Sequence, residues 1–151
     1  MRRTIAKQIK GNEYLLHADM FNTDKFPTSA KVLNTGLGES NLLNIAGGLL
    51  SQGNIVYIYA VAGFIMHRIE QLKYSCLPYS DNGKIIIFNA GKIGYAKLGD
   101  GHTIDNNKDI CQMLKITYMS PEDIKHLNVY LKLIESQKSG IYYIELGKDY
   151  E

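Results

Sequence analysis

One strand–turn–helix–strand stretch constrains the fold of this chain more than any other part of it. Residues 31–34 have the pattern of a short strand, and residues 35–40 form a Gly-rich turn. Apolar residues then recur at helical spacing over 41–52, and Gly53 suits a helix end. Residues 55–61 are rich in β-branched and aromatic side chains, which favours a buried strand. A unit of this size permits a βαβ crossover. We therefore predict an α/β or α+β fold, a single-domain mixed β-sheet with helices packed on it.

Local signals outside this stretch predict the remaining elements. Gly11-Asn12 lies between two strand-like runs and predicts an N-terminal β-hairpin over residues 3–10 and 13–20. Ser120, Pro121 and Asp123 predict a helix start with Ser120 as N-cap. Further strands are expected over 85–89, 92–98, 115–118 and 141–146, and further helices over 64–74 and 108–115. Since no linker or repeat divides the sequence, we expect one domain over residues 1–151.

Composition and charge exclude several classes of protein. Seventeen Lys and Arg oppose fifteen Asp and Glu, so a net charge of +2 does not favour nucleic acid as a partner. The longest apolar run is too short to span a membrane. Cys76 and Cys111 do not suggest a disulfide framework, and the expected location is cytoplasmic with reduced thiols. The eleven tyrosines predict a homo-oligomer. The adjacent Gly47 and Gly48 in the 41–52 helix indicate either a contact between subunits or a close helix crossing within the chain.

The Gly-rich turn is the first candidate binding site. Thr35, Gly36, Gly38 and Ser40 precede the predicted helix, whose first N–H groups have no partner within the helix. Glycines let a ligand approach the backbone, and a helix N-terminus attracts an anion. The alternative is a tight turn with Ser40 as N-cap. Glu39 argues against a bound phosphate unless its carboxylate points away.

The same residues suggest a weak family resemblance. Gly36-Leu37-Gly38, the pair Leu42-Leu43 and the 55–61 strand resemble the acyl-CoA-binding segment of the GNAT-type acetyltransferases. The resemblance covers about thirty residues and implies an acyltransferase that uses CoA. The sequence lacks the family's Arg or Gln before the turn, and its Leu pair comes one residue late.

A second candidate site is Asp100, His102 and Thr103. A histidine can act as a general base near neutral pH, and a neighbouring aspartate can orient it. No H-x-x-x-H or C-x-x-C spacing is present, so no metal site is expected.

Three functions stay open at this stage. The first is a small non-catalytic binding protein for an anionic or nucleotide-like ligand or for a protein partner, without a cofactor. The second is the GNAT-like acyltransferase, with acyl-CoA as its donor. The third is a ligand-free protein-inhibitor module.

Overall fold

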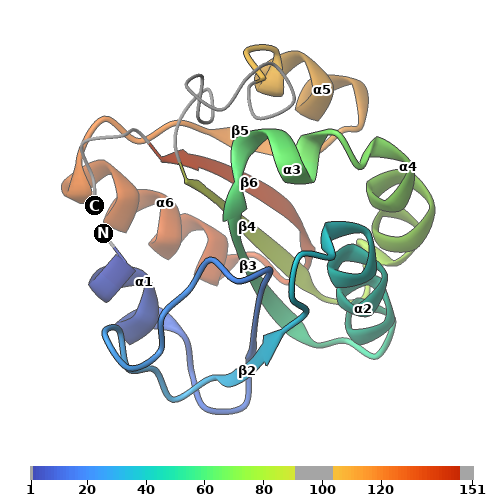
Figure 1. The fold of residues 1–151 in the computed structure, drawn as a ribbon. Coiled ribbons are helices and arrows are strands. Elements are labelled where there is room, and N and C mark those ends of the chain that lie inside the picture. Colours follow the sequence, from blue (N-terminus) through green and yellow to red (C-terminus); the bar gives the residue numbers. More distant parts are fainter. Residues whose placement is uncertain (1, 91–103, 147–151) are drawn as a thin grey trace.

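The computed structural model describes residues 2–90 and 104–146 and contains one six-stranded sheet in which every described pair of strands is parallel. The strand order is β2-β1-β3-β4-β6-β5 (Figure 1). The strands are β1 (Tyr14–His17), β2 (Lys31–Asn34), β3 (Ile55–Val61), β4 (Lys84–Ala90), β5 (Thr117–Met119) and β6 (Gly140–Leu146). The expected α/β fold, a sheet with helices packed on it, is confirmed, but the described strands pair in parallel only, so the predicted mixed pairing is wrong for these strands.

Helices cover both faces of the sheet. They are α1 (Arg2–Gln8), α2 (Glu39–Ser51), α3 (Ala62–Met66), α4 (Ile69–Gln71), the π-helical turn η1 (Leu72–Cys76), the 3₁₀ turn η2 (Leu77–Tyr79), α5 (Asn107–Met113) and α6 (Ile124–Ser136). One apolar core joins α2, α3, η1 and α5 to one face, and a second joins α1 and α6 to the other. No described helix has the length and apolar character needed to cross a bilayer.

The N-terminal hairpin prediction is wrong. Residues 2–8 form helix α1, and β1 pairs in parallel with both β2 and β3. Ile5, Ala6 and Ile9 are spaced for one face of a helix, and all three are at most 3% exposed. Burial of this face against the sheet outweighs the turn signal at Gly11-Asn12.

The helix at residues 124–136 begins later than predicted. Asp123, and not Ser120, is the N-cap, and its carboxylate accepts the backbone N–H of His126 at 2.8 Å. This bond satisfies an N–H of the first turn, which is the role of an N-cap side chain. Ser120 and Pro121 belong to the segment between β5 and α6.

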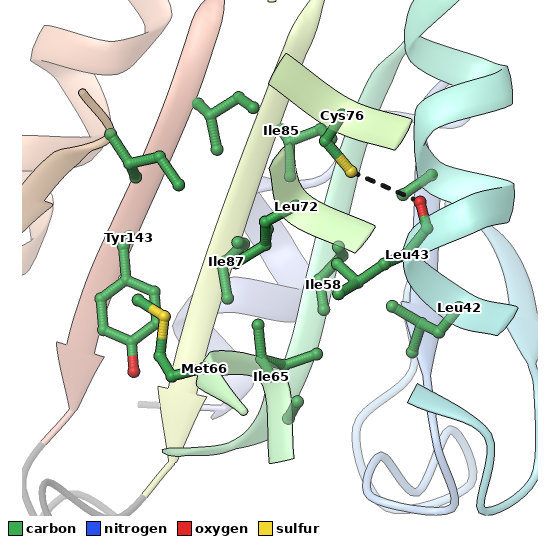
Figure 2. Close-up of a cluster of buried hydrophobic side chains, with 14 of the residues drawn as sticks. Leu42, Leu43, Ile58, Ile65, Met66, Leu72, Cys76, Ile85, Ile87 and Tyr143 are labelled. Carbon is green, nitrogen blue, oxygen red and sulfur yellow. Dashed lines mark hydrogen bonds between the residues drawn. The ribbon is translucent and has the colours of Figure 1, made fainter. Parts of the chain in front are cut away.

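The two helix glycines have different surroundings. A Cβ at Gly47 would lie 1.9 Å from the carbonyl oxygen of Ser75, whereas a Cβ at Gly48 would meet nothing within 4 Å. Gly47 therefore permits the close approach of α2 and η1, as a crossing within the chain requires. In the same contact the Cys76 thiol donates to the carbonyl of Leu43 at 3.4 Å (Figure 2).

Candidate functional site

The predicted Gly-rich turn lies at the carboxyl edge of the sheet, between the end of β2 and the start of α2 (Figure 1). Ligands in open α/β sheets bind outside the carboxyl ends of the strands, at points where the strand order reverses. Here β1 connects outward to β2, while β3 lies on its other side. The turn follows the edge strand β2, so it lies at the carboxyl edge of the sheet beside the reversal between β1 and β3.

Hydrogen bonds hold the turn against the end of β1. The Asn34 side chain accepts the N–H groups of Asp19 and Gly36 at 3.1 and 3.0 Å, and it donates to the Asp19 carboxylate at 2.7 Å. The Thr35 N–H donates to the carbonyl of His17 at 2.9 Å. Gly36 has a φ of +63°, which favours glycine. Hydrogen bonds to Asp19 and His17 therefore fix the start of the turn to the end of β1 and the residues after it.

Helix α2 begins at Glu39, with Gly38 as its N-cap and no side-chain capping bond. Ser40 is therefore not the cap, and its hydroxyl makes no hydrogen bond among the described residues. Gly38 has a φ of −137°, so it does not need the left-handed region. The first N–H groups of this helix therefore receive no side-chain cap from the described residues.

Glu39 is the residue at this edge whose surroundings most need an explanation. The residue is only 9% exposed, and no hydrogen bond or ion pair to its carboxylate occurs among the described residues, so its carboxylate oxygens reach solvent without a protein partner. Its neighbour Leu37 is 84% exposed, a large apolar surface two residues away. A carboxylate with no protein partner is available to a bound molecule that supplies an N–H or ammonium group.

His17 lies beside the turn and was not singled out by sequence reasoning. It is 4% exposed, and its Nδ1 accepts the backbone N–H of Phe21 at 3.4 Å. Burial lowers the pKa of His17, against the opposing effect of Asp19. The imidazole is thus neutral near pH 7 with its proton on Nε2, where it can serve as a donor.

A pocket of 630 Å³ opens beside His17 and Asn34. The loop between β1 and β2 supplies most of its polar lining, including Asn22, Thr23 and Thr28. Its volume is in the range of sites for small organic ligands. The Asn34 side chain thus connects the turn at Gly36 to this pocket.

A second polar cluster lies at the same carboxyl edge, around β6. The Glu145 carboxylate is 5% exposed and accepts from the Asn107 amide at 2.8 Å and from the Tyr118 hydroxyl. Asn89 is paired with Glu145 in register and is 1% exposed, and its side-chain amide has no hydrogen-bond partner among the described residues. The Tyr143 hydroxyl likewise has no partner within the described part of the chain, and it points toward the carboxyl ends of the strands (Figure 2).

Sequence reasoning missed this cluster, although one signal was present. Asn89 and Glu145 are single polar residues within otherwise apolar strand runs, a pattern that marks buried polar groups. The predicted second site at Asp100, His102 and Thr103, and the predicted strand over 92–98, lie outside the described residues. No group of three potential metal ligands occurs among the residues described here.

Comparisons with known proteins identify a fold neighbour and no family. Neither a protein-family model nor a curated protein matches the chain. A solved structure described as a split gene transketolase, inactive beta4 tetramer, is similar with a TM-score of 0.70 and 22% identity. The match covers 89% of this chain but only 45% of that one. The chain therefore shares an α/β domain fold with that protein and spans less than half of its length.

Proposed function

We propose that this chain is a binding subunit of a transketolase-like assembly. In this proposal it holds a nucleotide-like ligand at the carboxyl edge of its sheet, and it has no catalytic activity by itself. The carrying observation is the Glu39 carboxylate at this edge, for which the described residues provide no hydrogen-bond donor. An amino group or ring N–H of a heteroaromatic ligand would supply that donor in a charge-assisted hydrogen bond.

An exposed apolar side chain at the same edge supports association with a second chain. Leu37, two residues before Glu39, is 84% exposed, and a partner surface placed over it would remove this apolar side chain from water. The similar solved structure is a split gene transketolase in an inactive tetramer of one chain type. By analogy, copies of this chain would associate, and activity would require a further chain.

Ligand chemistry at the turn follows from its donors and acceptors. The ligand's nitrogen donor would face Glu39, and its acceptors would face the Ser40 hydroxyl and the free N–H groups at the start of α2. A nucleotide-like molecule carries both kinds of group. An anion with no nitrogen donor would meet the Glu39 carboxylate and be repelled.

Native mass spectrometry of the purified chain, followed by titration with nucleoside diphosphates, tests this proposal. We expect an oligomer, and a non-covalent nucleotide-like adduct either after purification or on titration. Ser40→Ala should weaken the adduct without lowering the melting temperature, because Ser40 does not cap α2. An adduct of CoA would favour the acyltransferase alternative, and a monomer that binds no member of the series would contradict the proposal.

A further inference from the structure

A pocket of 230 Å³ lies at the amino end of the sheet, on the face covered by α1 and α6. Its walls come from the starts of β3 and β4, from the end of α6 and from the residues after α1. The candidate site at Glu39 lies at the opposite edge of the same sheet. The pocket is therefore separate from the site of the proposed function.

Lys84 brings a buried positive charge to this pocket. Its side chain is 8% exposed, and its ammonium donates to the carbonyls of Ile134 and Glu135 at 3.2 and 3.3 Å. These carbonyls belong to the last turn of α6, where the helix dipole favours a cation. An ammonium group has three protons, so one remains for a ligand. Lys84 has no ion pair among the described residues.

Glu13 brings a buried negative charge to the same pocket. It is 5% exposed, and its carboxylate accepts the backbone N–H of Lys10 at 2.7 Å. Burial, and then the Glu13 carboxylate, raise the pKa of Tyr57, whose ring also lines the pocket. Glu13 and Lys84 therefore face one cavity with opposite charges and do not pair with each other.

We propose that this pocket binds a small zwitterion of the amino-acid class. Its carboxylate would bind the free proton of Lys84, and its ammonium would bind the Glu13 carboxylate. Buried charges are stabilised when each is paired and hydrogen-bonded, and one zwitterion provides both partners at once. At about 30 Å³ for each water-sized group, the cavity holds roughly eight such groups, enough for a small amino acid.

The mouth of the pocket fits the entry of a charged molecule. Lys10 and Glu135 form an ion pair of 3.0 Å at its rim, and their side chains are 62% and 53% exposed. Both signs of charge are therefore present in solvent at the entrance. A pair exposed to this degree contributes little to stability and can open without a large cost.

Carbon-13 methyl NMR of the full chain tests the proposal directly. The probes are glycine, β-alanine and γ-aminobutyrate, with acetate and ethylamine as singly charged controls. We expect saturable shifts of the pocket-lining methyls of Ile55, Ile86 and Leu131 with at least one zwitterion. The methyls of Ile58 and Ile87, on the other face of the sheet, should not move. The singly charged probes should bind about tenfold more weakly or worse.

Two variants identify the charges that bind. Glu13→Gln keeps the shape of the side chain and should weaken zwitterion binding about tenfold, while Glu122→Gln, at an exposed glutamate, should not. Lys84→Met should weaken binding in the same way, with Lys132→Met on α6 as its control. Should Lys84→Met fail to fold, Glu13→Gln decides alone. Absence of saturable shifts, equal binding of acetate, or unchanged affinity in Glu13→Gln would overturn the proposal and leave Lys84 as a helix cap only.

Discussion

The contact between α2 and η1 gives the sharpest prediction about the fold, because substituting alanine at two adjacent glycines should change stability in opposite directions. At Gly48 a new methyl group meets nothing within 4 Å. Gly48→Ala therefore keeps only the gain in helix propensity, which is about 1 kcal/mol. We expect this variant to raise the free energy of unfolding by about that amount.

At Gly47 the same methyl group is placed 1.9 Å from the Ser75 carbonyl oxygen and 2.6 Å from its carbonyl carbon. Backbone atoms of η1 would have to move by about 1 Å or more, and overpacking of this kind costs about 1–3 kcal/mol even after relaxation. The movement would also strain the hydrogen bond from Ser75 to Asn44, which is 2.6 Å long. We therefore expect Gly47→Ala to lower the free energy of unfolding by about 1–3 kcal/mol.

Urea unfolding of the two variants beside the wild type measures this difference, which should be about 2–4 kcal/mol. In a thermal scan each kcal/mol should move the melting temperature by about 2–4 °C for a chain of this size. If Gly47→Ala were as stable as the wild type, α2 and η1 would not be in backbone contact. If Gly48→Ala were strongly destabilised or changed the oligomer mass, Gly48 would lie in an interface between chains.

Three further predictions concern single groups. Burial lowers the pKa of His17, so the unfolded chain takes up a proton at a higher pH than the folded chain does. The free energy of unfolding should therefore fall as the pH drops below about 6.5. His17→Gln should reduce this pH dependence, and His67→Gln, at an exposed histidine, should not. A slope unchanged in His17→Gln would refute the assignment. Burial raises the pKa of both Cys76 and Cys111 to about 12, so iodoacetamide should label them slowly in the native chain and rapidly in urea; fast native labelling would contradict their burial. Asp123→Ala should lower the urea midpoint through loss of the α6 N-cap, and an unchanged midpoint would place the cap elsewhere.

Sequence patterns predicted the elements whose signals are local. The apolar stripe of α2 and the dense run of β3 specify a helix and a strand from a few neighbouring residues, and Gly53, with a φ of +76°, ends the helix as predicted. The segment at Ile5 and Ile9 was misjudged because a turn signal outweighed a short helical stripe. Its burial depends on the distant strands of the sheet, which no local pattern encodes.

The candidate site was predicted in part for the same reason. Gly36 and Gly38 mark a turn that the structure places at the carboxyl edge, where the parallel sheet favours a ligand. His17 comes next to this turn only because β1 pairs with β2, and Asn89 faces Glu145 only because β4 pairs with β6. Strand order and register are set by long-range packing, so these neighbours could not be derived from spacing along the chain.

The most direct test of the account is the affinity of Glu39→Gln for the nucleotide-like ligand, measured together with its stability. Because the Glu39 carboxylate has no partner among the described residues, its removal should change the free energy of unfolding by no more than about 1 kcal/mol. Ligand affinity should fall about tenfold or more, since the charge-assisted hydrogen bond is lost. Glu70→Gln, at an exposed glutamate, should leave both quantities unchanged. Wild-type affinity in Glu39→Gln would contradict the central claim that the Glu39 carboxylate receives the ligand.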